Sequence, residues 1–357
     1  MSEKKIIIIT LISLSAVALG FLTAAVLDSF RPAINFSTAV LETSNTITEP
    51  SLSSAEEAFN RLLTGASNFD ASLKKAQAED EKISQQLADL ATTTASHKNL
   101  SQETYEKMII NRLGQAIYTS NGTNSSIMIF ELRKEDFRGY MAKIKLKKSS
   151  ALRVTISPDS KPKGETTSQA AQRMGAIFAV NGGGFATLTT NGVAKTVPLG
   201  NTMINGKLIG EFVPSVNNLA FAGFSKNNKL VGGVYKNESE LKASGAYQGV
   251  SFVPVLIRDW DAIKIPSKWA KARQPRTVLG QYPNGDIFFI VVDGRRSNWS
   301  SGITLEEMQI LLMRLGVMEA FNLDGGGSSA MYYNGKVLNK PSDGKQRNMA
   351  TNIVVFK

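Results

Sequence analysis

The sequence has 357 residues, of which 42% are hydrophobic and 20% charged, a composition typical of a chain that folds around a sizeable core. It has no cysteine and a single histidine, His97, which excludes disulfides, thiol nucleophiles, cysteine-ligated zinc and any site that needs two histidines. The net charge is +11, but residues 1–112 carry 10 basic and 13 acidic side chains, whereas residues 113–357 carry 31 and 17, a net of +14. This charge either attracts nucleic acid, anionic lipid or anionic glycopolymer, or only keeps the second part of the chain soluble.

The N-terminus is typical of a membrane anchor. Lys4 and Lys5 precede an uncharged run of 22 residues, Ile6–Leu27, and about 20 apolar residues span a bilayer. A cleaved signal peptide usually has a shorter apolar core, although small residues near the end of this run also permit cleavage. Positive charges stay inside, so we expect a single-pass protein of the cell membrane, held through residues 6–27, with its N-terminus in the cytoplasm and its C-terminal domain extracellular. An extracellular domain argues against nucleic acid as a partner.

A linker and a helical stalk are expected after the cytoplasmic tip and anchor, residues 1–28. Residues 29–54 are rich in Ser, Thr and Pro, which predicts a linker. Residues 55–118 predict a stalk: apolar residues recur at alternating steps of four and three until the run 91–94 stops the first helix, and a second helix follows from Ser101 to about Tyr118. The members of this seam are Leu62, Ala66, Phe69, Leu73, Ala76, Asp80, Ile83, Leu87 and Leu90. Either a self-packed helical hairpin or a coiled coil that makes a homodimer fits the pattern, and His97 falls in the connection without a chemical role.

The remaining residues, 119–357, predict a domain of strands with a few flanking helices. The expected strands are 127–130, 141–147, 177–180, 219–224, 230–235, 250–257, 287–292, 320–323, a hairpin over 330–338 and 350–356. A helix over 168–174 is capped by Thr166 or Thr167, and the clearest helix, 304–315, begins after Thr304 and ends before Gly316. Strands outnumber helices without regular alternation, so the fold class is α+β with a mixed or antiparallel sheet.

Two glycine-rich strand ends are the first candidates for chemistry. Asn181, Gly182 and Gly183 follow one apolar strand, and a similar run follows another. The second run comprises Asp324, Gly325, Gly326, Gly327 and Ser328. Glycine allows a ligand to approach the backbone, and successive free N–H groups bind anions. Neither run matches a phosphate-binding loop of nucleotide-binding proteins or a dinucleotide fingerprint, so a pair of tight turns is the alternative.

Charged side chains stand at further strand ends. Asp293 and Arg295 follow the strand 287–292, Arg276 precedes another strand, and Arg347 precedes the last one. The guanidinium fork matches the geometry of phosphate, and two such forks could clamp a phosphodiester. Taken singly, each arginine is equally well explained as a surface or ion-paired residue.

These elements together resemble the phosphodiester glycosidase family, over residues 170–357 and extending to about 113. The matching residues occur in the family's order and are Asn181-Gly-Gly with Phe185, Pro275-Arg276-Thr277 with Gly280, Val292-Asp293-Gly294-Arg295, Gly302-Ile303-Thr304-Leu305, Leu315-Gly316, Asn322-Leu323-Asp324-Gly-Gly-Gly-Ser-Ser, and Arg347. The family usually has two aromatic residues directly after the first two glycines. Here Gly184 intervenes and Ala186 follows Phe185, so the sugar is not predicted.

The resemblance implies hydrolysis of a glycosyl–phosphate bond. Asp324 would supply the carboxylate that acts on the sugar, as nucleophile or as base for water, with Asp293 as second choice. Arg276 and Arg347 would hold the phosphate, and Arg295, Asn181 and the glycine-rich runs would complete the binding site. No cofactor is required; a Ca²⁺ ion held by oxygen ligands is compatible with such a site, but no ligand spacing predicts one, and no metal ligands are assigned.

The expected location and charge suggest an anionic cell-surface glycopolymer as the substrate, such as a teichoic acid or a phosphate-containing exopolysaccharide. Two alternatives remain open from sequence. A non-catalytic glycopolymer-binding or exopolysaccharide assembly protein of the same fold would keep the arginines but tolerate loss of Asp324. A structural stalk protein would depend on residues 55–118 and not on Arg276.

Overall fold

A computed structural model describes residues 52–96, 102–190, 192–216 and 218–357. The predicted anchor, most of the predicted linker and His97 lie outside the described residues. The described residues fall into two compact units that divide between Leu73 and Lys74. Among the helices of the described segments, none is both long enough and apolar enough to cross a membrane.

The stalk region contains two helices, α2 (Leu52–Ser96) and α3 (Gln102–Leu113). The prediction that residues 91–94 stop the first helix is wrong, because α2 continues through them. In the first unit, Phe69 of the predicted seam is 61% exposed. In the second unit, Tyr105 and Ile109 of α3 are buried in the core of the strand-rich domain. The α3 helix therefore packs on that domain, which the seam pattern did not predict.

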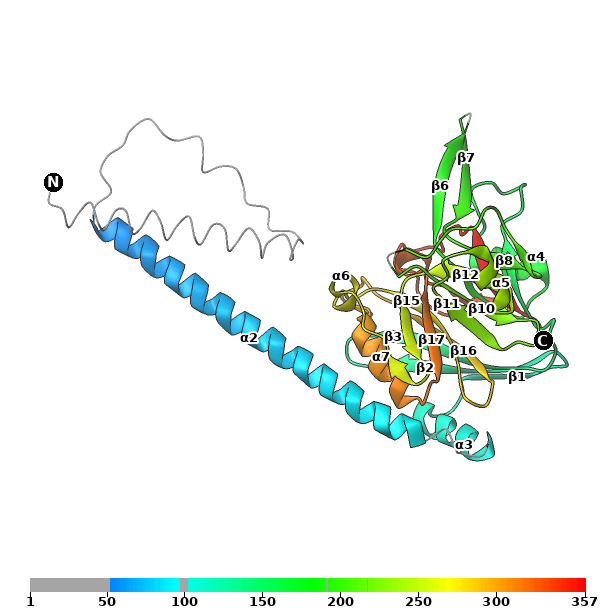
Figure 1. The fold of residues 1–357 in the computed structure, drawn as a ribbon, viewed down its shortest axis with the longest axis horizontal. Helices are drawn as coiled ribbons and strands as arrows, with labels where there is room; N and C mark the ends of the chain where they lie inside the picture. The colour runs from blue at the N-terminus through cyan, green and yellow to red at the C-terminus, as the bar shows by residue number, and fades with distance from the viewer. Residues whose placement is uncertain (1–51, 97–101, 191, 217) are drawn as a thin grey trace. The chain divides into compact units, whose positions relative to one another are not determined.

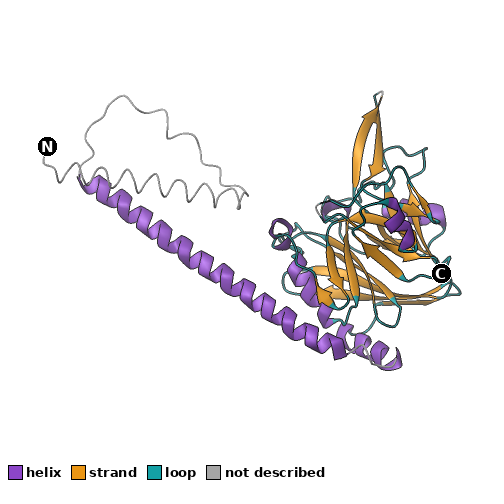
Figure 2. Cartoon of the chain, viewed as in Figure 1, coloured by secondary structure: helices purple, strands orange, loops and turns teal. Residues whose placement is uncertain are grey.

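The second unit is built on one large and two smaller sheets, and its strand pairs are antiparallel (Figures 1 and 2). The large sheet has the order β1-β2-β3-β16-β15-β17-β13-β14. Its strands are β1 (Tyr118–Asn121), β2 (Ser125–Arg133), β3 (Arg138–Leu146), β13 (Val255–Arg258), β14 (Asp261–Ala262), β15 (Arg276–Gln281), β16 (Ile287–Val292) and β17 (Glu319–Leu323). The antiparallel arrangement with few helices confirms the predicted α+β class.

The two smaller sheets have five strands each, in the orders β11-β10-β12-β8-β9 and β19-β18-β5-β20-β4. The first contains β8 (Met203–Ile204), β9 (Lys207–Leu208), β10 (Ala220–Ser225), β11 (Leu230–Gly233) and β12 (Ala246–Phe252). The second contains β4 (Leu152–Ile156), β5 (Phe178–Asn181), β18 (Met331–Tyr333), β19 (Lys336–Val337) and β20 (Thr351–Val355). Strands β6 (Phe185–Thr190) and β7 (Val193–Pro198) pair only with each other, and this hairpin projects from the domain (Figure 1).

Apolar side chains on the two faces of the large sheet form two cores. One face meets the smaller sheets, where Phe178, Phe289 and Phe321 are buried together. The other face is covered by α7 (Leu305–Arg314) and α3, where Leu312, Tyr105 and Phe288 belong to one buried cluster. Alternate residues of β16 therefore serve different cores, which explains why the whole strand is apolar.

The predicted helix ends agree with the structure where a capping pattern is present. Helix α4 (Thr167–Met174) begins after Thr166, whose hydroxyl accepts from the N–H of Gln169. Helix α7 begins after Thr304 in the same manner, with Glu307 completing the capping box. Two short helices, α5 (Glu238–Ala243) and α6 (Ser267–Ala270), were not predicted.

The predicted strand over 250–257 is wrong in one respect. The structure divides it into β12 and β13, which belong to different sheets and are separated at Pro254. Proline has no N–H to donate to a neighbouring strand, so a continuous strand through this position is disfavoured.

Candidate functional site

Three neighbouring strands of the large sheet bring charged residues to one edge. Arg276 begins β15, opposite Val292 at the end of β16, and Thr277 lies opposite Leu323 at the end of β17. Because the strands are antiparallel, the start of β15 and the ends of β16 and β17 meet at the same edge. Asp293 and Asp324, which directly follow the last two strands, are therefore near Arg276 in the fold.

The two glycine-rich strand ends meet at this edge, as the sequence predicted. The N–H of Asp324 donates to the carbonyl oxygen of Gly182 at 3.3 Å. The side-chain amide of Asn181 donates to the carbonyl oxygen of Asp324 at 2.5 Å, and its oxygen accepts from the Thr277 hydroxyl and from the N–H of Ala330. Asn181 is fully buried, so its side chain holds the site together and is not free to bind a sugar or a phosphate.

Most glycine N–H groups of the two runs are also bonded within the protein, contrary to the predicted anion nest. Gly182 and Gly183 donate to the carbonyl and hydroxyl oxygens of Thr351, at 3.0 and 3.2 Å. In the second run, Gly325 donates to the Asp324 carboxylate and Gly326 to the carbonyl of Pro275. The glycines are needed mainly for close packing: a Cβ atom at Gly182 would lie 2.8 Å from the Thr351 carbonyl oxygen.

The Asp324 carboxyl lies at the centre of the site with a raised pKa. Burial raises the pKa of Asp324 from 3.8 to about 6. Hydrogen bonds from the Ser328 hydroxyl and from the Gly325 N–H, together with the charge of Arg347, limit the rise. Such a group is largely ionised at neutral pH but close enough to titration to exchange a proton, which is the behaviour of a carboxylate suited to catalysis.

Arg347 approaches Asp324 through Ser328. Its Nη1 atom lies 3.4 Å from the Ser328 hydroxyl oxygen, and its Nη2 atom lies 2.6 Å from a carboxylate oxygen of Asp343. The Arg347 guanidinium lowers the pKa of Asp343. A Cβ atom at Gly327 would meet both members of this ion pair, so a larger residue there would displace the ends of the two side chains. Of the two arginines predicted to clamp the phosphate, Arg347 is therefore already paired with an acid.

Arg276 and Arg295 form the cationic part of the site that makes no ion pair. Within the described residues neither has a carboxylate within 4 Å, although the charge of Arg295 helps to lower the pKa of the nearby Asp343. Arg276 donates to the carbonyl of Ala272 at 2.9 Å, and burial followed by the charge of Arg295 lowers the pKa of Arg276 to about 10. Arg295 donates to Gln274 at 2.6 Å, and its guanidinium lies beside Gly326.

The backbone of Arg295 supports a functional role. Its φ of 60° is in the left-handed region, which costs a non-glycine residue on the order of 1–2 kcal/mol. Strain of this kind is concentrated at sites where a side chain has to be held in a particular place. Two neighbouring guanidinium groups without an acid are stabilised by a bound anion, and their fork geometry suits a phosphate.

The structure does not leave Asp293 free to react with a substrate. Its carboxylate is 2% exposed and accepts from the indole N–H of Trp299 at 2.8 Å, from Asn339 at 3.0 Å and from the N–H of Lys340 at 2.9 Å. Burial raises the pKa of Asp293, and these three donors counteract the rise. The catalytic role of Asp293 stays a prediction; in the structure its carboxylate ties the loop after β16 to residues 339–340.

Several residues of this region were missed from the sequence. Trp299 has Arg138 at 4.4 Å and Lys340 at 3.5 Å from the centre of its ring, so it is held by two cations and by Asp293. Asp343 carried no signal, because a spacing of four residues brings side chains together only on a helix, and residues 341–347 are not helical. Asn339 carried none, because its partners are distant in the chain.

Other features of the described residues do not add to this site. No group of three or more Asp, Glu or His residues within them could hold a metal ion, so the described residues add no support for a bound Ca²⁺ ion.

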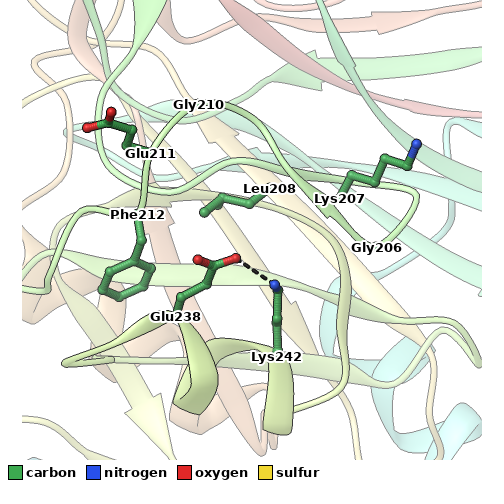
Figure 3. Close-up of a pocket in the computed structure, with 8 residues that line it drawn as sticks. All are labelled: Gly206, Lys207, Leu208, Gly210, Glu211, Phe212, Glu238 and Lys242. Atoms are coloured by element: carbon green, nitrogen blue, oxygen red, sulfur yellow. Dashed lines mark ion pairs between the residues drawn. The ribbon is translucent and has the colours of Figure 1, made fainter.

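A cavity of about 710 Å³ is lined by Phe212, Glu238 and Lys242, together with residues 206–208, 210 and 211 (Figure 3). Glu238 and Lys242 pair with each other there, and none of the residues that surround Asp324 lines it.

Comparisons with known proteins point to one family. The sequence profile described as "Phosphodiester glycosidase" matches residues 174–356. The chain is 30% identical over 200 residues to the N-acetylglucosamine-1-phosphodiester alpha-N-acetylglucosaminidase of Bos taurus, covering 52% of this chain and 36% of that protein. It is 42% identical over 89 residues to the SPbeta prophage-derived uncharacterized protein YomE of Bacillus subtilis (strain 168), covering 24% of this chain and 14% of that protein. The chain thus matches little more than a third of the length of the first of these relatives, and less of the second.

A solved structure has a similar fold. The catalytic domain of zebrafish N-acetylglucosamine-1-phosphodiester alpha-N-acetylglucosaminidase, auto-inhibited by its pro-peptide, superposes with a TM-score of 0.52 at 20% sequence identity. The match covers 68% of this chain and 86% of the zebrafish chain. At this identity the likeness concerns the fold, and any argument about chemistry depends on the side chains described above.

Proposed function

Because this chain belongs to the phosphodiester glycosidase family, we propose that its strand-rich domain hydrolyses the glycosyl–phosphate bond of a sugar phosphodiester. The observation that carries the proposal is the meeting of Asp324, with its pKa of about 6, and two guanidinium groups that make no ion pair at one edge of the sheet. The two kinds of group match the two halves of the substrate, since the sugar needs a carboxylate and the phosphate needs cations.

Asp324 acts on the anomeric carbon in this proposal. The bond from that carbon to the bridging oxygen breaks, and the electron pair leaves with the phosphate. The ionised Asp324 carboxylate either attacks the carbon directly or takes a proton from the water that attacks it. In the first route the anomeric carbon becomes bonded to Asp324, and water then hydrolyses this ester and restores the carboxylate. Both routes need the charged form of Asp324, and both end with a free sugar and a phosphomonoester.

Arg276 and Arg295 stabilise the departing phosphate. A phosphodiester carries one negative charge, and the monoester leaving group gains a second as the bond breaks. Guanidinium groups therefore bind the transition state more tightly than the substrate, which is the condition for lowering the barrier. Because phosphate is a good leaving group, no separate strong acid is required. Arg347, already paired with Asp343, orients Ser328 and with it the Asp324 carboxylate.

We further propose that the domain acts outside the cell membrane on a phosphodiester-linked polymer of the cell envelope. The uncharged run Ile6–Leu27 behind Lys4 and Lys5 supports an anchor, and the net charge of +14 on residues 113–357 supports an anionic polymer as the substrate. A teichoic acid or a phosphate-containing exopolysaccharide has the required bond.

Release of sugar from purified wall polymer tests the proposal. The wild-type chain is expected to release free sugar and leave phosphomonoester ends, whereas Asp324→Asn releases at least about 10³-fold less. Binding of the polymer by Asp324→Asn, measured in the same preparation, shows that the variant is folded. Binding by wild type without any release of sugar would overturn the hydrolase and favour a binding module.

A further inference from the structure

A second cavity lies at the opposite end of the strands that carry the site. It measures about 560 Å³, and its lining includes Lys145, Lys148, Lys229, Gln281 and Asp286. Gln281 ends β15, whereas Arg276 begins it, so the two sites are separated by the length of this strand, about 17 Å at the usual rise per residue. We call this cavity the lysine cavity.

Three loops that form the lysine cavity are held together by buried or partly buried polar groups. The side-chain amide of Gln281, 4% exposed, donates to the carbonyl of Gly285 at 2.9 Å and accepts from the N–H of Leu230 at 3.1 Å. The side chain of Asn228 donates to the carbonyl of Lys148 at 2.8 Å. These bonds join the turn after β15, the turn after β10 and the loop after β3, so the cavity is a built feature of the fold.

The charge of the lysine cavity is strongly positive. Four lysines line it, Lys145, Lys147, Lys148 and Lys229. Its one acidic residue, Asp286, is 2% exposed and is already bonded to the buried Lys143. Within the described residues none of the four lysines makes an ion pair, and Lys147 donates only to the neutral oxygens of Asn121 and Gly122. Like charges gathered in this way repel one another until an anion binds among them.

We propose that the lysine cavity binds a phosphate group of an anionic polymer, as a site separate from Asp324. Lysine ammonium groups bind phosphate as point charges, and the side chain of Asn227 lines the same cavity. This proposal rests on the proposed function only in identifying the polymer as the substrate. A chain with regularly repeated phosphates can occupy the lysine cavity while one of its bonds lies at Asp324, which raises the local concentration of that bond.

Equilibrium binding of a short inorganic polyphosphate to the full-length chain, at fixed salt, tests the proposal without any need for turnover. The variant Lys145→Ala/Lys148→Ala/Lys229→Ala is expected to bind about tenfold more weakly than wild type. The matched control Lys207→Ala/Lys236→Ala/Lys264→Ala loses the same charge from exposed lysines outside the cavity and is expected to change affinity by less than about twofold. Equal losses in the two variants would overturn the proposal.

Two further arms identify the site and the source of the phosphate. The variant Arg276→Lys/Arg295→Lys should keep the binding of polyphosphate; a loss confined to this variant would mean that the polymer binds only beside Asp324 and would overturn the proposal.

Vesicles that contain anionic phospholipid should bind wild type and the lysine variant alike. If the lysine variant loses vesicle binding but keeps polyphosphate binding, the cavity binds a lipid headgroup and the proposal is wrong. If wild type hydrolyses no substrate, the proposed function is wrong, but the binding of polyphosphate by the lysine cavity can still be measured and compared.

Discussion

The side-chain amide of Asn181 donates to the main-chain carbonyl of Asp324 at 2.5 Å, across 143 positions of sequence. This bond joins the end of β5 in one sheet to the end of β17 in another. The position of the Asp324 carboxylate therefore depends on the packing of two sheets and on one buried amide. Asn181 is a positioning residue, and its place at the head of a glycine-rich run reflects that geometry.

The activity is expected to rise with pH through about 6. Burial raises the pKa of Asp324 to about 6, and both proposed routes need its ionised form. Below this pH, kcat/KM should fall by about tenfold per pH unit, and above it the acidic limb should level off. A pH profile with a sugar phosphodiester substrate measures this. An activity that instead falls as the pH rises through 6 would show that Asp324 works as an acid.

Asp324→Asn is expected to stabilise the protein while it abolishes activity. The folded-state pKa of Asp324 is above its unfolded value, so the folded protein loses stability as the pH rises from about 4 through 6. An amide has no such ionisation. The free energy of unfolding of the variant should exceed that of wild type by about 1–2 kcal/mol at pH 7.5, after allowance for the partial exposure of Asp324 to water.

Urea denaturation at two pH values measures this difference. The gain should vanish at pH values well below the unfolded pKa of 3.8, where the carboxyl is protonated in both the folded and the unfolded chain. A variant that is less stable than wild type at pH 7.5 would contradict the raised pKa and with it the position of Asp324 in a desolvated site.

Arg295→Ala is expected to lower kcat/KM by about 10²–10³-fold with little change in stability. Arg295 is exposed, and alanine keeps the Cβ atom, so the cost of the left-handed backbone is the same in the variant. Arg276→Lys keeps a positive charge but loses the fork geometry, so a smaller loss of about tenfold or more is expected. Steady-state kinetics measure both variants. Arg153→Ala, which removes an arginine that lies over the ring of Phe356, is the control and should leave the kinetics unchanged.

Asp293→Asn is expected to destabilise the fold by about 2–3 kcal/mol. The amide nitrogen would face donors from Trp299, Asn339 and Lys340, which now all donate to the carboxylate. The denaturant midpoint measures the loss. Asp343→Asn, which weakens a partly exposed ion pair with Arg347, is the matched control and should cost less than about 1 kcal/mol. If Asp293→Asn unfolds like wild type but is inactive, Asp293 takes part in the reaction after all.

Much of the fold follows from local patterns in the sequence. The start of α7 was predicted correctly and that of α4 to within one residue, because Thr304 and Thr166 belong to capping boxes, which are complete within four residues. The hairpin after β18 was predicted because Asn334 and Gly335 both adopt positive φ in its turn. The end of α2 was misplaced because a run of weak helix formers lowers helix stability by only a few tenths of a kcal/mol per residue, which neighbouring turns can offset.

The sequence indicated which strand ends carry the candidate residues, but not which hydrogen bonds and ion pairs their side chains make. Strand ends that carry Asp324 and Arg276 are visible in the sequence, and antiparallel pairing brings them together. Which carboxylate is free depends on distant donors: Asn339 is 46 positions from Asp293. No local pattern indicates such a contact, so the sequence ranked Asp324 ahead of Asp293 without showing that Asp293 is held by three donors. The same holds for the choice of arginine, because Asp343 pairs with Arg347 and not with Arg295.

The hairpin of β6 and β7 begins three residues beyond Gly182, yet it pairs with no other strand among the described residues (Figure 1). Leu188 and Val193, on its two strands, are more than half exposed, so the hydrophobic interior does not depend on them. An exchange of this arm for a longer or differently shaped one would cost the rest of the domain little. Relatives could thus diverge in what they recognise by remodelling this appendage while the reacting carboxylate stays in place.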